Sequence, residues 1–165
     1  MIRLAEVNAL EAPAFIARCG DVAEHSPWVA ERAERQRPFA SVDAMVAAFQ
    51  AAIRDASEAE QLRLIQAHPD LAGRARMAEE SRKEQAGAGL DRLSADEFVR
   101  FTDLNSRYRE RFGIPFILAV KGATRHQILD SFAGRLGNDR DTELATALDQ
   151  VCRIVGFRLA ERVAP

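Results

Sequence analysis

The stretch that decides the fold is SADEFVRFTDLNSRYRERFG, residues 94–113. Ser94 stands three residues before Glu97, which is the spacing of a capping box that starts a helix. The apolar side chains that follow recur at intervals of three and four residues, on one helix face: Phe101, Leu104, Tyr108 and Phe112. Gly113 suits the left-handed position that ends a helix. The stretch therefore predicts one long amphipathic helix.

Capping residues and apolar periodicity elsewhere predict further helices. The expected helices cover residues 9–19, 28–36, 42–53, 58–68, 71–87, 94–113, 124–136 and 141–163. FGIPFILAV, residues 112–120, is a continuous apolar run that fits either a short buried extended segment or the first turns of a helix. No alternating pattern is long enough to build a sheet. We therefore expect an all-α fold, a single-domain compact bundle of about eight helices, with residues 1–165 as one domain.

Composition argues against several function classes. The chain has 165 residues, of which 47% are hydrophobic, and this is enough to bury a core. The net charge of -2 leaves no basic surplus for nucleic acid, and no segment approaches the ~20 apolar residues that span a membrane. The N-terminal residues do not resemble a signal peptide. Cys19 and Cys152 fit buried thiols, so a reducing, cytoplasmic compartment is expected.

The candidate chemistry lies in IQAHPDLAGRARMAEESRKEQAGAG, residues 65–89. Pro69 disfavours helical dihedral angles in the residue before it, so a helix should end at His68. An imidazole at a helix end titrates near neutrality and suits general acid or base catalysis. The alternative is a histidine that only complements the negative end of the helix dipole.

A second polar group follows within the same stretch. Ser81, Glu84 and Gln85 are spaced i, i+3 and i+4, which places a hydroxyl, a carboxylate and an amide on one helix face. However, Ser81 and Glu84 also have capping-box spacing, so these residues could simply begin a helix near Arg82. The spacing leaves both interpretations open.

Arg158 is the other candidate, because it shares the apolar face of the last expected helix with Val151, Ile154 and Val155. A guanidinium in that position needs an anionic ligand or a carboxylate partner. The alternatives to a binding role are an internal ion pair and a side chain that reaches the surface.

Metal ligation is poorly supported, since there is no HExxH and no paired CxxC motif. Neither a Gly-rich phosphate loop nor a GxSxG elbow occurs. A mechanism that uses no metal or cofactor is expected.

Several motifs in order resemble one known family. They are HPDLAG at 68–73, SRKEQAGAGLDRLS at 81–94, FxxLNxxYxxRFG at 101–113, IPFILAVKG at 114–122 and IVGFRL at 154–159. Together they resemble the OHCU decarboxylases, which act on 2-oxo-4-hydroxy-4-carboxy-5-ureidoimidazoline (OHCU), the last intermediate between urate and (S)-allantoin. The resemblance implies an all-α fold, no cofactor or metal, and a homodimer.

The same resemblance implies catalytic roles for His68 and Glu84. The substrate-binding residues that it implies form a wider set: Pro69, Ser81, Gln85, Phe116, Ile117, Leu118, Ala119, Val120 and Arg158. Ile114 departs from the family pattern, which often has phenylalanine before this proline. The function expected is a cofactor-independent carboxy-lyase that converts OHCU to (S)-allantoin. The alternative is a non-catalytic helical module of the same fold that binds a ligand or a partner.

Overall fold

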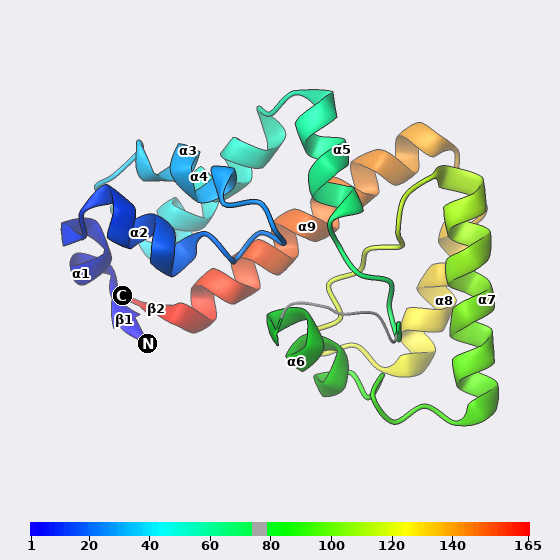
Figure 1. The fold of residues 1–165 in the computed structure, drawn as a ribbon. Helices are drawn as coiled ribbons and strands as arrows, with labels where there is room; N and C mark the ends of the chain where they lie inside the picture. The colour runs from blue at the N-terminus through cyan, green and yellow to red at the C-terminus, as the bar shows by residue number, and fades with distance from the viewer. Residues whose placement is uncertain (74–78) are drawn as a thin grey trace. The chain divides into compact units, whose positions relative to one another are not determined.

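The computed structural model describes residues 1–73 and 79–165 (Figure 1). The described elements are β1 (Ile2–Arg3), α1 (Leu4–Ala9), α2 (Ala12–Cys19), α3 (Trp28–Glu34), α4 (Val42–Arg54), α5 (Glu58–Gln66), α6 (Glu79–Gly87), α7 (Ala95–Phe112), α8 (Arg125–Arg135), α9 (Arg140–Arg162) and β2 (Val163–Ala164). The two short strands pair in parallel, with Ile2 opposite Val163. The all-α class is therefore confirmed. No helix in the described ranges is long and apolar enough to cross a membrane.

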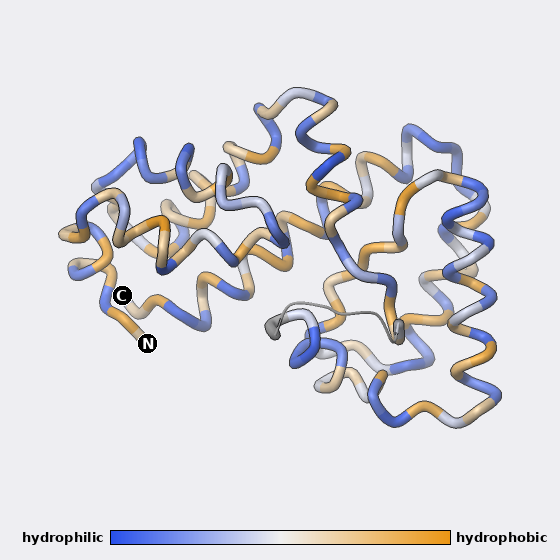
Figure 2. The backbone as a smooth tube through the Cα atoms, in the orientation of Figure 1, coloured by the Kyte–Doolittle hydropathy of each residue, from blue (hydrophilic) through white to orange (hydrophobic). Residues whose placement is uncertain are grey.

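Helix boundaries that rest on local capping are where the sequence places them. In α7 the Ser94 amide donates to the Glu97 carboxylate at 2.8 Å, and the Glu97 amide donates back to the Ser94 hydroxyl at 3.2 Å. Gly113 closes the helix with a left-handed φ of 72°. Ser57 and Glu60 form the same reciprocal pair at the start of α5. Apolar and polar bands alternate along α7, as expected for a helix with one buried face (Figure 2).

Two predicted helices differ at their starts. The one expected from residue 9 begins at Ala12, because the shorter α1 precedes it and the backbone at Leu10 is extended. The prediction of a helix from about Leu71 is wrong, because residues 71–73 form a turn in which Ala72 has a left-handed φ of 56° that an α-helix cannot include. Residues 74–78 of that prediction lie outside the described residues, and α6 ends at Gly87 as expected.

The described residues divide into two units by their contacts. The first contains residues 1–67 and 151–165. Within it α3 packs against α2 and α4, and Phe15 lies 6.2 Å from Phe39 and 6.1 Å from Phe49 between ring centroids. Aromatic and aliphatic side chains therefore form the core of this unit.

The second unit, residues 68–150, contains the stretch that carries the candidate chemistry. Its core is built around Phe132 of α8, which stacks on Phe116 at 3.6 Å between ring centroids. The rings of Tyr108 and Phe101, both from α7, meet Phe132 edge-on at 6.1 and 6.3 Å. These contacts hold α7, α8 and the segment after Gly113 together.

Both cysteines are free and buried, as predicted. Burial raises the pKa of the Cys19 thiol to about 11. Because the thiolate is the reactive form, we expect neither thiol of the native protein to react appreciably with a disulfide reagent near neutral pH. Both should react promptly in denaturant, and the absorbance of the released thiol measures the difference. Rapid reaction of the native protein would contradict this burial.

Candidate active site

His68 lies directly after the C-terminal end of α5. The helix ends at Gln66, and the Ala67 amide still donates to the Arg63 carbonyl. This is two residues earlier than the predicted end at His68, and Pro69 keeps the chain from continuing as a helix. The His68 side chain is only 6% exposed. A buried imidazole at a helix end is thus the first component of the site.

α6 supplies the second component. The helix already includes Glu79, two residues before Ser81, so Ser81 is not its capping residue and the capping interpretation is wrong. Ser81 and Gln85 are buried and Glu84 is half-buried, whereas the neighbouring Arg82 is exposed. The prediction that the hydroxyl, carboxylate and amide share one helix face is therefore confirmed.

The amide of Gln85 contacts the turn that follows His68. Its Oε1 accepts a hydrogen bond from the Ala72 amide at 2.8 Å, and its Nε2 donates to the Asp70 carbonyl at 3.4 Å. A glutamine amide has a second lone pair on its oxygen and a second hydrogen on its nitrogen. Gln85 is thus a structural contact of the turn, and the substrate-binding role that the resemblance implies stays a prediction.

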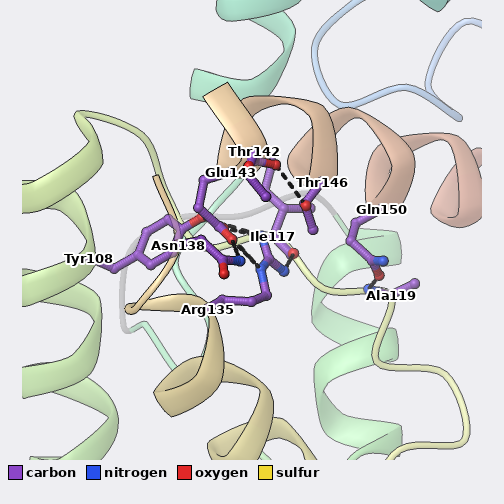
Figure 3. Close-up of polar contacts among 9 residues, drawn as sticks. All are labelled: Tyr108, Ile117, Ala119, Arg135, Asn138, Thr142, Glu143, Thr146 and Gln150. Carbon is purple, nitrogen blue, oxygen red and sulfur yellow. Dashed lines mark hydrogen bonds and ion pairs between the residues drawn. The ribbon is translucent and has the colours of Figure 1, made fainter. Parts of the chain in front are cut away.

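The apolar run after Gly113 is not helical, so the extended alternative is confirmed. Its backbone is held by side chains from two helices (Figure 3). Arg135 of α8 donates to the Ile117 carbonyl at 2.6 Å, and the Ala119 amide donates to Gln150 of α9 at 3.0 Å. Because the Ala119 amide is already engaged, substrate contacts by this segment would come from its other backbone groups.

A buried ionic cluster supports this segment. The Arg135 guanidinium lies 2.9 Å from the Glu143 carboxylate, which also accepts hydrogen bonds from Tyr108 and, at 2.7 Å, from Asn138 (Figure 3). The guanidinium also lies over the Phe116 ring, 4.3 Å from its centroid. Burial, followed by the hydrogen bond to Glu143, raises the pKa of Tyr108 well above its usual value, so the phenol stays neutral.

Sequence reasoning missed this cluster, although one signal for it was available. Arg135 follows Ile128 and Phe132 at i+7 and i+3, on the apolar face of its helix. This is the same pattern that singled out Arg158. Applied to Arg135, it would have predicted a buried guanidinium and a carboxylate partner for it.

Arg158 lies in the first unit, and its described contacts are with that unit. Its Nη1 lies 3.2 Å from the Val22 carbonyl and 3.3 Å from a Glu24 carboxylate oxygen, and both charged side chains are buried. Arg153 is exposed, as expected. The internal ion pair is therefore confirmed for Arg158. Its participation in a site with His68 and Glu84, which belong to the second unit, stays a prediction.

In the part of the chain that the structure describes, no three or more histidine, cysteine or acidic side chains are grouped so that they could hold a metal ion. The candidate residues of the second unit instead carry an imidazole on His68, a hydroxyl and a carboxylate on Ser81 and Glu84, and an amide on Gln85. These groups can transfer protons and form hydrogen bonds to a small polar molecule.

Comparison with known proteins assigns the family. The family model described as OHCU decarboxylase matches residues 8–160. The chain belongs to the OHCU decarboxylase family. Among members of this family, it is 47% identical over 161 residues to the 2-oxo-4-hydroxy-4-carboxy-5-ureidoimidazoline decarboxylase of Haloferax volcanii, covering 98% of this chain and 96% of that protein.

Two further proteins to which the chain is similar are longer than it is. The chain is 40% identical over 161 residues to the uric acid degradation bifunctional protein of Bacillus sp. strain TB-90, covering 98% of this chain and 32% of that protein. A crystal structure of an (S)-allantoin synthase superposes with a TM-score of 0.82 and 28% identity, covering 99% of this chain and 54% of that one. The chain therefore spans about half the length of that synthase.

Proposed function

We propose that this chain is a carboxy-lyase that converts OHCU to (S)-allantoin in urate degradation. The observation that carries the proposal is the near-full-length match to the Haloferax volcanii decarboxylase at 47% identity. The motifs that carry the resemblance include His68 and Glu84, and the matched residues 8–160 contain both. The proposal therefore rests on the whole chain together with the residues suited to the chemistry.

The reaction breaks the bond between C4 of the ring and its carboxylate. Carbon dioxide leaves, and the electron pair of the broken bond forms a double bond between C4 and the carbon that bears the ureido group. The electrons of the neighbouring C=N move onto its nitrogen, which takes up a proton. The C4 hydroxyl becomes a ring carbonyl as it loses its proton, and the carbon that bears the ureido group gains a proton. An enzyme for this reaction must stabilise the developing negative charge and deliver that proton to one face.

His68 and Glu84 are the residues that we assign to proton transfer. An imidazole can both donate and accept protons near neutral pH, and a carboxylate can take the hydroxyl proton. The buried position of His68 and the half-buried position of Glu84 support this assignment, since a site that excludes water strengthens its electrostatic interactions.

We assign substrate binding to the remaining residues that the resemblance implies. Ser81 and Gln85 would donate or accept hydrogen bonds with the ring and ureido groups, and Pro69 would shape the turn that carries His68. Arg158 would hold an anionic or carbonyl oxygen. Backbone groups of residues 116–120 would line the pocket, apart from the Ala119 amide, which is bound to Gln150.

We further propose that residues 1–165 act as one domain, that the chain forms a homodimer, and that it works in the cytoplasm without a cofactor. The match of a single family model to residues 8–160, across both units, supports the first point. The two free cysteines support a reducing compartment. The homodimer and the absence of a cofactor rest on the resemblance to the family.

The proposal is tested by generating OHCU in solution from urate with the two enzymes that precede this step, and following allantoin by circular dichroism. OHCU decomposes unaided to racemic allantoin, which gives no signal. We expect the intact protein to speed the decay of OHCU and to give a circular dichroism signal of one sign. Racemic product formed at the spontaneous rate would reject the enzyme and favour the non-catalytic binding module.

A further inference from the structure

The turn that follows His68 is held by side chains from α6 and α7, and two of these have no assigned role. Asn105 of α7 donates from Nδ2 to the Leu71 carbonyl at 2.8 Å. Arg109, one helical turn later, donates from Nε to the two Asp70 carboxylate oxygens at 2.9 and 3.2 Å. With Gln85, these side chains contact three consecutive residues, 70–72.

Asn105 makes this contact from a buried position. Its side chain is 8% exposed, and the bond to the Leu71 carbonyl decides which way the amide faces, because the reversed amide would set two oxygens against each other. Its Oδ1 has no hydrogen-bond partner within the described residues. Burying an unpaired Oδ1 costs free energy, a cost that an apolar side chain at this position would avoid. The hydrogen bond from Nδ2 to the Leu71 carbonyl is therefore the benefit that accounts for an asparagine here.

Arg109 and Asp70 form a pair that is too exposed to contribute much to stability. Their side chains are 46% and 32% exposed, and ion pairs of this kind are weak in water. However, Asp70 lies only two residues from His68. The proline ring of Pro69 fixes one torsion between them and restricts the backbone of His68 itself. Holding Asp70 therefore limits the positions open to His68.

We propose that Asn105 and Arg109 are positioning residues for His68, which act through the turn at residues 70–72. This inference rests on the proposed function, in which His68 transfers a proton. Proton transfer requires the donor to lie close to the reacting atom, and a small displacement of the donor slows the reaction steeply. The two α7 side chains set the position of the imidazole without touching the substrate.

The matched pair of variants is Arg109→Met and Arg107→Met. Arg107 lies on the same helix and also pairs with an aspartate, since its Nη1 is 3.6 Å from Asp103, but that partner lies on α7 itself. Both substitutions remove one positive charge and one exposed ion pair. Only Arg109→Met releases the turn. We expect Arg109→Met to lower kcat by about 10- to 100-fold with little change in KM or melting temperature, and Arg107→Met to resemble the unmodified protein.

A double-variant cycle separates positioning from a general loss of structure. If Arg109 acts through Asp70, the Asp70→Ala, Arg109→Met double variant should be no slower than either single variant. Additive losses would overturn the proposal. So would full activity of Arg109→Met, an equal loss in Arg107→Met, or a fall in activity that only matches a loss of folded protein.

An NMR measurement made without substrate tests the positioning of His68 separately from the decarboxylase activity. The two carbon-bound ring protons of His68, on Cδ2 and Cε1, give NMR correlations, and their loss in the His68→Ala variant assigns them. At fixed pH we expect these signals to move or broaden in Arg109→Met and to stay unchanged in Arg107→Met. Unchanged signals in both would overturn the positioning role, whether or not the protein decarboxylates OHCU.

Discussion

Replacing His68 with alanine is expected to lower the rate of (S)-allantoin formation by about 10²–10⁴-fold, the range that positioned general acid or base groups contribute. The substitution removes the imidazole but leaves α5 intact, because this helix ends at Gln66. The coupled assay from urate measures the rate, and far-UV circular dichroism measures helix content. As the enzymatic rate falls, the spontaneous reaction supplies more of the product, which should become nearly racemic.

The matched control is His126→Ala. His126 lies exposed in the first turn of α8, so its loss should leave both the rate and the sign of the product signal unchanged. Glu84→Ala should resemble His68→Ala if the two residues act in one proton-transfer sequence. Retention of the native rate and enantiomer by His68→Ala would show that another group delivers the proton, and our assignment of roles would then be wrong.

The parts of the fold that the sequence predicts are those that depend on neighbouring residues. The start of α7 is decided by Ser94 and Glu97, three residues apart, and its end by Gly113. The start of α8 follows the same logic, with Thr124 as its capping residue. For such elements the stabilising contacts lie within one helical turn, so periodicity and capping residues are sufficient.

The parts that it does not predict depend on residues far apart in the chain. The turn after His68 is held by Asn105 and Arg109, which contact residues 34 and 39 positions away. A helix over Leu71 is consistent with the local sequence, whereas in the structure Ala72 has a left-handed backbone and donates its amide to the Gln85 side chain of α6. The resemblance to the family therefore predicts which residues belong to the candidate site. The long-range contacts that hold the turn after His68 are not predictable from the sequence.

The second large effect expected is on stability, at Glu143. This carboxylate is fully buried and accepts hydrogen bonds from Arg135, Tyr108 and Asn138 (Figure 3). Glu143→Ala would leave the Arg135 guanidinium buried without its counter-charge. Breaking a buried pair in this way costs about 3–5 kcal/mol, so we expect the free energy of unfolding in urea to fall by about that amount.

Asp141→Ala is the matched control, because Asp141 is exposed in the same first turn of α9. Both variants lose a negative charge near the positive end of the helix dipole, and this loss alone costs only about 0.3–1 kcal/mol.

The double variant Arg135→Met, Glu143→Leu removes both charges, and it should recover much of the stability lost in Glu143→Ala, since the unpaired guanidinium is gone. If the double variant is as unstable as Glu143→Ala, the loss comes instead from the hydrogen bonds of Tyr108, Asn138 and the Ile117 carbonyl. In that case the cluster stabilises the extended segment through geometry rather than through charge.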